Sequence, residues 1–311
     1  MALTLAQAEL YTTNMVYRGI IEEFIRQSPI FPRLSFMEVV GNAYQYLRES
    51  TRSGAAFYDP LDTWTESTGT VTQVTIGLKI LGGDADIDNF LVSTRSDKTD
   101  IESELIMEKV KSVKFTFLDG FYYGDDSVNA KAFDGLHALV PTAMQLHEGA
   151  TTVAGGLNIS TLDELMDLIE DGPPDILVMP KAIRRLINAY IRANGLFEQN
   201  RDEWGNMVQM YAGVPIYVDD SLVTTEALTG GAYLSKTGGT TCGSIFAIRF
   251  GPKDVFGIQN SGSIAVKKIR DELDDKDAKR YRIKWYCGLG LGYTKSLARI
   301  DGIASTTAVA A

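Results

Sequence analysis

The chain has 311 residues, of which 45% are hydrophobic and 10% aromatic. This content supports one large core or two modest ones and excludes intrinsic disorder and a disulfide-stapled miniprotein. Forty acidic residues against thirty basic ones give a formal net charge of −10, which opposes any role that needs a broad basic surface on nucleic acid.

The cysteines and the N-terminus place the chain in a reducing compartment. Cys242 and Cys287 are far apart and lack CxxC or Cys/His spacing, so neither a zinc site nor a redox pair is indicated. We expect two small buried side chains. The N-terminal residues lack the pattern of a signal peptide, and no apolar run approaches the roughly 18 residues of a membrane span. We therefore expect synthesis in a cytoplasm.

The N-terminal part predicts a helix, a short strand and a long two-stranded arm. From Thr13 apolar residues recur at helical spacing until Pro29, which disfavours helix in the residue before it. A β-like run, SFMEVV, then stops at Gly41. Residues 42–80 carry two alternating stretches around a centre, 50–70, that is poor in large aliphatic residues. Because an isolated hairpin is marginal in water, we expect another subunit to cover this arm.

The clearest helix is predicted to begin near Thr99. The run Thr99-Asp100-Ile101-Glu102 matches a capping box, and acidic residues crowd the start while lysines lie toward the end, which complements the helix dipole. One face is apolar at helical spacing, through Ile106, Val110, Val113 and Phe117.

The rest of the chain alternates helix and strand before a β-rich end. The capping box Thr161–Glu164 opens a predicted helix that runs through Ile169. A buried strand at 175–179 and a helix at 181–194, started by Pro180, follow. A strand pair or bent strand is predicted around Gly213, and a long hairpin from Ile264 to Tyr293 with an acidic turn at 271–277.

Two runs imitate ligand-binding motifs. Asp84, Asp86 and Asp88 resemble the start of a calcium loop, but Asn89 and Arg95 stand where a glycine and a glutamate are needed, so we expect a solvated turn. The glycines of GLGLG at 288–292 lack the following helix of a dinucleotide site. They indicate a close backbone approach or a bend in a strand.

No catalytic motif is present. His137 and His147 are the only histidines, so a Ser-His-Asp or Cys-His scheme must use one of them, and we expect His137 to pack against a loop. Two basic clusters are expected to be solvated or ion-paired faces: Lys181, Arg184, Arg185 and Arg192, and Lys267, Lys268 and Arg270.

The order of the elements resembles that of the major capsid proteins of tailed double-stranded-DNA bacteriophages, whose fold is shared with encapsulin nanocompartments. TVTQVTIGLKILGGDADIDNF is similar to the family's return strand before its long spine helix, and FDGL to the turn after that helix. PDILVMPKAIRRLINAY is similar to its strand and proline-started helix, YAGVPIYVDD to a later strand, and GSIFAIRFGPKD to a closing element. The resemblance covers nearly the whole chain.

The resemblance implies an α+β fold in four parts. These are an N-terminal arm at 1–40, an extended two-stranded loop at 41–80, a peripheral domain at 81–125 and 256–293 with a spine helix at about 99–121, and an axial domain of mixed sheet and helices at 126–255 and 294–311.

It also implies a structural protein of the virion and not an enzyme. Copies would assemble through pentamers and hexamers into an icosahedral shell around viral double-stranded DNA, in the host bacterial cytoplasm. The implied partners are other copies, a separate scaffolding protein, a portal, a decoration protein and DNA bound without sequence specificity; no cofactor, metal or membrane is expected. We expect inter-subunit contacts at Phe24, Tyr44, Arg48, Arg52, Phe57, Tyr58 and Trp64.

Three alternatives stay open. An encapsulin-like shell would enclose protein cargo in place of DNA. A soluble α+β enzyme would use His137 or His147 with a carboxylate. A phage tail or minor head protein would form tubes or rings.

Overall fold

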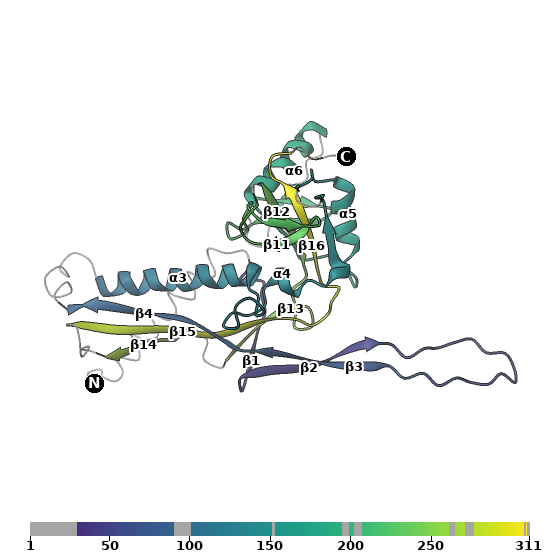
Figure 1. The fold of residues 1–311 in the computed structure, drawn as a ribbon, viewed down its shortest axis with the longest axis horizontal. Coiled ribbons are helices and arrows are strands. Elements are labelled where there is room, and N and C mark those ends of the chain that lie inside the picture. Colours follow the sequence, from purple (N-terminus) through teal and green to yellow (C-terminus); the bar gives the residue numbers. More distant parts are fainter. Residues whose placement is uncertain are drawn as a thin grey trace.

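The structure is a computed structural model that describes residues 30–89, 101–150, 153–194, 199–201, 207–239, 241–260, 265–270, 277–307 and 309. It has an elongated base, an upper lobe, and a two-stranded hairpin that extends away from both (Figure 1). The predicted N-terminal helix, Phe24, and the capping residues Thr99 and Asp100 lie outside the described residues.

Strand β15 (Ala278–Leu291) is the centre of the base. It pairs antiparallel with β4 (Lys79–Asp88) along one edge and with β13 (Val255–Asn260) and β14 (Ala265–Arg270) along the other. Strand β1 (Phe36–Val39) pairs in parallel with β13 and completes a five-stranded sheet. The antiparallel pairing of β14 with β15 confirms the predicted long hairpin.

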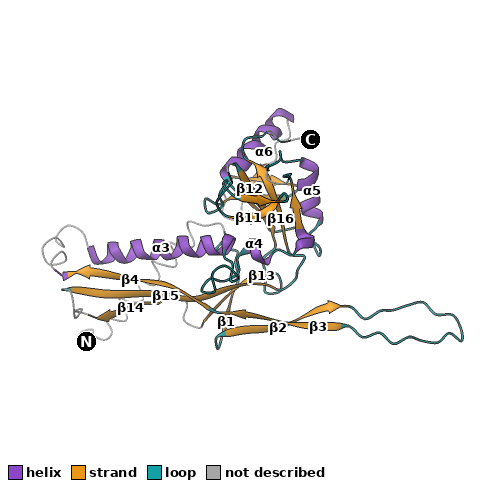
Figure 2. Cartoon of the chain, in the orientation of Figure 1, coloured by secondary structure: helices purple, strands orange, loops and turns teal. Residues whose placement is uncertain are grey.

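Helix α3 (Ile101–Tyr123) lies along the base sheet (Figure 2). The ring of Phe117 lies 4.6 Å from that of Trp285 on β15. The helix ends at Tyr123, close to the predicted end at about 121. Near this end Tyr122 is fully buried and its hydroxyl donates to Asp219 at 3.2 Å. The predicted apolar stripe is confirmed as buried: Ile106, Val110, Val113 and Phe117.

The upper lobe is built on a seven-stranded mixed sheet. In spatial order its strands are β5 (Gln145–His147), β16 (Leu297–Ala304), β12 (Cys242–Ile248), β6 (Ile176–Met179), β9 (Val214–Val218), β8 (Met207–Tyr211) and β7 (Gln199–Arg201). The β8–β9 pair confirms the strand pair predicted around Gly213.

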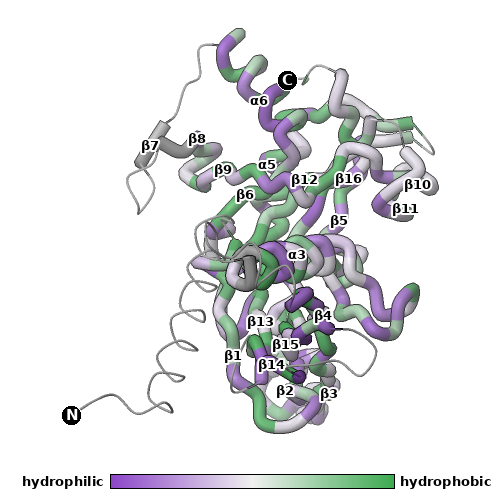
Figure 3. Tube along the Cα trace, turned by 90° about the vertical axis from the view of Figure 1, so that its left-hand side faces the viewer, coloured by the Kyte–Doolittle hydropathy of each residue, from purple (hydrophilic) through white to green (hydrophobic). Residues whose placement is uncertain are grey.

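Helices and short elements complete the upper lobe. Helices α5 (Ile159–Asp167) and α6 (Lys181–Asn194) flank the sheet, and α6 alternates hydrophilic and hydrophobic stretches (Figure 3). The short elements are α4 (Leu136–Leu139), the 3-10 turn η1 (Thr142–Met144), β10 (Ala227–Thr229) and β11 (Ala232–Ser235).

The predicted start of α5 is wrong. The helix begins at Ile159 with Asn158 as its N-cap residue, before the capping box that we placed at Thr161. The backbone N–H of Asn158 donates to Oε1 of Glu148 at 3.1 Å. A carboxylate from an earlier segment therefore holds the chain at this helix start.

The solvated turn predicted at Asp84 to Asp88 is also wrong, because these residues form the end of β4. Alternate side chains of a strand point to the same face. Asp84 accepts from Nε of Arg282 at 2.7 Å, and Asp86 accepts from Nε of Arg280 at 2.6 Å. The spacing of the aspartates thus matches that of two arginines on β15.

Candidate functional site

The extended hairpin is formed by β2 (Ala43–Thr51) and β3 (Thr70–Gly77), which pair antiparallel. Residues 52–69 connect the two strands as a long loop that projects away from the base (Figure 1). This confirms the two-stranded arm expected from the alternating pattern. It also places four of the predicted contact residues on the loop: Arg52, Phe57, Tyr58 and Trp64.

The root of the hairpin is held by its own chain. Tyr44 and Tyr46 pack edge-on against Phe256 of β13, with ring centroids 5.9 and 6.2 Å away. The Tyr46 hydroxyl donates to the carbonyl of Leu291 at 2.5 Å. Arg48 donates through Nε to the carbonyl of Gly292 at 3.1 Å and through Nη2 to that of Leu291. Two predicted contact residues, Tyr44 and Arg48, therefore contact the base of the same molecule.

The glycines of GLGLG lie under this root. A Cβ on Gly288 would come within 3.1 Å of the carbonyl oxygen of Gly77, and one on Gly290 within 2.3 Å of Cδ1 of Ile76. A side chain at position 290 would force the side chain of Ile76 to move, and one at position 288 would press on the hairpin backbone at Gly77. The close backbone approach predicted from the alternating glycines is confirmed.

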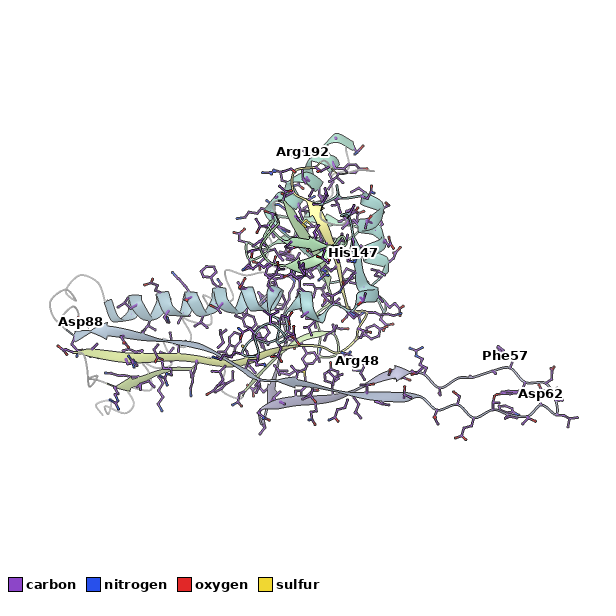
Figure 4. The ribbon with its side chains drawn as sticks, viewed as in Figure 1. Arg48, Phe57, Asp62, Asp88, His147 and Arg192 are labelled. Atoms are coloured by element: carbon purple, nitrogen blue, oxygen red, sulfur yellow. The ribbon has the colours of Figure 1, made fainter. Side chains whose placement is uncertain are left out.

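The loop at the end of the hairpin exposes large apolar side chains. Phe57 and Leu61 have relative exposures of 107% and 104%, and Trp64 of 77%. Trp64 stacks on Tyr58 with ring centroids 4.3 Å apart. Phe57 and Asp62 lie far from the body of the molecule (Figure 4), and Arg52 is exposed where the loop begins.

Contacts within this loop are local. The Tyr58 hydroxyl and Oγ1 of Thr65 are 3.0 Å apart. The backbone N–H of Asp59 donates to the carboxylate of Asp62, and the backbone N–H of Asp62 donates to the carbonyl of Asp59, which closes a turn. Leu61, at the apex, has a left-handed φ of 79°, which residues other than glycine rarely adopt. The apolar tip therefore receives no cover from the base or the upper lobe.

A second cluster surrounds the two histidines. Nδ1 of His147 donates to Asp301 at 2.5 Å. Nη1 of Arg299 donates to Nδ1 of His137 at 2.8 Å, and Nε2 of His137 lies 3.4 Å from Glu226. The two histidines thus each lie beside a carboxylate, as the enzyme alternative requires.

The expectation that His137 packs against a loop is met by Glu226, which lies in the loop before β10, but the aromatic rings around His137 come from α3, β11 and β12. His137 is buried on α4, its ring stacks on that of Tyr233 at 3.7 Å, and the ring of Tyr123 lies 5.0 Å away. Burial lowers the pKa of His137, as does the nearby charge of Arg299. Since arginine only donates, Nδ1 of His137 accepts and the imidazole is neutral.

The hydroxyl groups of this cluster bond to the buried carboxylate of Glu226 and not to a histidine. Oγ of Ser244 donates to Oε2 of Glu226 at 2.5 Å, and the Tyr123 hydroxyl donates to Oε1 of Glu226 at 2.8 Å. In a Ser-His-carboxylate triad the serine would donate to the histidine. Burial raises the pKa of Tyr123, which keeps it a donor.

Sequence reasoning missed Glu226, Arg299 and Asp301 as members of this cluster. The one available signal was a pair of charges, Arg299 and Asp301, inside an otherwise apolar strand pattern. Among the described residues, no three His, Cys, Asp or Glu side chains converge to hold a metal ion. In the same part of the chain, no helix combines the length and apolarity of a membrane span.

No protein-family model and no curated protein matches the chain. Solved structures do match. The holo-SrpI encapsulin complex from Synechococcus elongatus has a TM-score of 0.71 at 14% identity, covering 91% of this chain and 90% of that chain. The capsid of a native GTA particle has a TM-score of 0.62 at 14% identity, covering 88% and 90%. A cyanophage capsid has a TM-score of 0.56 at 12% identity, covering 88% of each chain. The chain therefore has the α+β fold of these proteins, which is the fold expected from the resemblance.

Proposed function

We propose that this chain is the major capsid protein of a tailed double-stranded-DNA bacteriophage. In this proposal it assembles through pentamers and hexamers into an icosahedral shell, with no enzymatic activity of its own. The observation that carries the proposal is the extended hairpin, whose apolar tip at Phe57, Leu61 and Trp64 stays exposed among the described residues, with only Tyr58 stacked on Trp64. The fold shared with phage capsids supports it.

The apolar tip would gain stability from burial against a second molecule. Burying one large apolar side chain contributes roughly 1.5–3 kcal/mol, and the hairpin root is fixed to the base by Tyr46 and Arg48. The root therefore sets the direction in which the hairpin projects, while the loop that carries the tip is held by local contacts such as that between Tyr58 and Thr65. In a closed shell every copy would both supply a tip and cover one.

The remaining parts of the proposal follow the resemblance. The arm, extended loop, peripheral domain and axial domain have the boundaries given above, and inter-subunit contacts concentrate at Arg52, Phe57, Tyr58 and Trp64, with Phe24 on the arm. Tyr44 and Arg48 support the loop from its root. The partners are a separate scaffolding protein, a portal, a decoration protein and packaged DNA. The mature location is the virion, after assembly in the host cytoplasm.

The test is negative-stain electron microscopy with light scattering on the purified full chain, with and without a candidate scaffolding protein. We expect closed shells, or stable pentamers and hexamers. A chain that stays monomeric or dimeric under all these conditions would contradict a shell function and favour the enzyme alternative at the histidine cluster.

An encapsulin-like compartment is the second candidate. The observation in its favour is the TM-score of 0.71 with an encapsulin complex against 0.62 with the GTA capsid. Particles purified from the native source separate the two candidates. Nuclease-resistant DNA inside the shell supports a capsid, whereas a packaged protein identified by mass spectrometry supports a compartment.

A further inference from the structure

The exposed side of α6 carries a stripe of arginines. Arg184, Arg185 and Arg192 are exposed, and at 100° per residue they lie within about 100° of the helix circumference and span about 12 Å of its axis. Figure 4 shows Arg192 at the end of the upper lobe, away from the extended hairpin. The helix packs inward through other positions, Ile183, Ile187 and Ile191.

These arginines differ from many other cations of the chain, which are paired. None of the three forms an ion pair with a described residue, although Nε of Arg192 donates to the carbonyl of Asn188 at 3.1 Å. The expectation of an ion-paired face holds for Lys181, which binds Asp220 at 2.6 Å. Elsewhere among the described residues the ion pairs include Lys79–Asp126, Lys236–Asp119, Arg249–Asp254, Arg280–Asp86, Arg282–Asp84, Lys295–Glu170 and Arg299–Asp301.

Helix stability does not explain the stripe. The first turn of α6 has no acidic residue, although the helix dipole favours negative charge there. Lys181 and Arg185 are four residues apart, a spacing at which like charges destabilise a helix. In a chain with a formal net charge of −10, a merely solvated face would be expected to mix both signs.

We propose that the Arg184, Arg185 and Arg192 stripe binds the phosphate backbone of duplex DNA without reading its sequence. The planar guanidinium group matches the oxygens of a phosphate, and a line of arginines suits a line of repeated phosphates. The stripe carries no large apolar side chain, which a helix lying on a membrane requires. It also carries no aromatic platform of the kind that stacks single-stranded bases.

The proposal goes beyond the shell function. DNA binding by α6 does not depend on the shell function. The shell function is needed only for the further step that the bound DNA is an enclosed genome. The stripe is narrow, so it is compatible with an acidic chain that lacks a broad basic surface. It would supply attraction at one position on a molecule that otherwise repels DNA.

The test measures binding of the full chain to a short fluorescein-labelled DNA duplex of arbitrary sequence, by fluorescence anisotropy across a series of salt concentrations. Two triple variants are compared with the unchanged chain. The first is Arg184→Gln with Arg185→Gln and Arg192→Gln. The matched control is Lys111→Gln with Lys131→Gln and Lys253→Gln, which removes three exposed charges from three separate places.

Each phosphate contact contributes about −0.9 to the slope of log affinity against log salt concentration. We expect the α6 variant to lose at least about tenfold in affinity at low salt and to have a slope shallower by about 2 to 3, while the control stays close to the unchanged chain. Equal losses in both variants, or no salt-dependent binding by the unchanged chain, would overturn the proposal. So would stronger competition by polyglutamate than by unlabelled duplex, because the stripe would then suit an acidic protein.

Electron microscopy of the same three proteins separates this proposal from the shell function. If all three form shells and only the α6 variant loses DNA affinity, both proposals are supported. If none forms shells but the affinity difference holds, the shell function fails and the DNA site stands.

Discussion

Gly290 of β15 lies directly beneath Ile76 of β3, so close that a Cβ at position 290 would be 2.3 Å from Cδ1 of Ile76. The hairpin crosses the base at this point, with Phe256 packed beside it. A side chain at position 290 would therefore displace the side chains of Ile76 and Phe256.

The first prediction concerns this crossing. Gly290→Ala would force Ile76 and Phe256 to move, and we expect it to lower the free energy of unfolding by about 1–3 kcal/mol, as overpacking does. Gly77→Ala is the matched control, because a Cβ at Gly77 meets nothing within 4 Å. Urea denaturation measures both, and equal effects of the two substitutions would show that the crossing is not tightly packed.

The second prediction concerns the apolar tip. Phe57→Ser with Leu61→Ser should leave the free energy of unfolding of the isolated chain within about 0.5 kcal/mol, since exposed side chains contribute little to folding. Shell yield by light scattering should fall at least about tenfold, because two buried apolar side chains are lost from each contact.

The control for the tip is Val128→Ser with Val153→Ser, which removes two exposed apolar side chains outside the hairpin. It should assemble like the unchanged chain. Normal assembly of the tip variant would mean that Phe57 and Leu61 stay exposed in the shell.

The third prediction concerns acidification. Burial holds the pKa of His137 below its usual 6.5, so below that pH the unfolded chain binds a proton that the folded chain does not. The contribution of neutral His137 to the free energy of unfolding is therefore complete above pH 6.5. It is lost as the pH falls from 6.5 toward the lower pKa that His137 has in the folded chain. The charged groups facing His137 are Glu226, Arg299 and Asp301.

We expect the free energy of unfolding to decrease by up to about 1.4 kcal/mol per pH unit from this one group as the pH falls below 6.5. His137→Gln should make the slope shallower in the same interval, whatever its effect at neutral pH. Denaturation curves at a series of pH values provide the slopes. Parallel slopes for the two proteins would contradict a neutral, buried His137.

The fourth prediction concerns the thiols. Both cysteines are free and buried, and burial raises the pKa of Cys242 and of Cys287 to about 12 each. At pH 8 the thiolate fraction should be about a thousandfold lower than in the unfolded chain. A thiol reagent should therefore label neither cysteine in the folded protein and both after denaturation. Rapid labelling of either one in the folded chain would show that this part of the core opens.

Local periodicity accounts for the predictions that are confirmed. Helix α3 follows from apolar residues at spacings of three and four, and the arm follows from two alternating stretches around a polar centre. Both patterns record which side of one element faces a core, and that information is contained within the element. The alternating glycines of GLGLG likewise indicated a close approach, although the sequence did not identify Ile76 as the residue above them.

The wrong predictions concern residues whose partners are distant in the chain. The aspartates of β4 imitated a turn because Arg280 and Arg282, which pair with them, lie nearly at the other end of the sequence. The start of α5 depends on Glu148. The charges around His137 come from β16, which carries Arg299 and Asp301, and from Glu226 in the loop before β10. Neither segment is near His137 in the sequence, so the sequence carries no sign of these contacts.

The sequence by itself predicted several of the described elements, among them α3, β6, α6 and the arm, and through their order the resemblance to a capsid fold. Only the tertiary structure decided which side chains are covered. It tied Tyr44 and Arg48 to the base, left Phe57 and Leu61 exposed at the tip, and set Arg184, Arg185 and Arg192 on an exposed helix side where no described carboxylate pairs with them. The physical reason is that periodicity depends on neighbours along the chain, whereas burial and charge pairing depend on neighbours in space, which chain folding alone brings together.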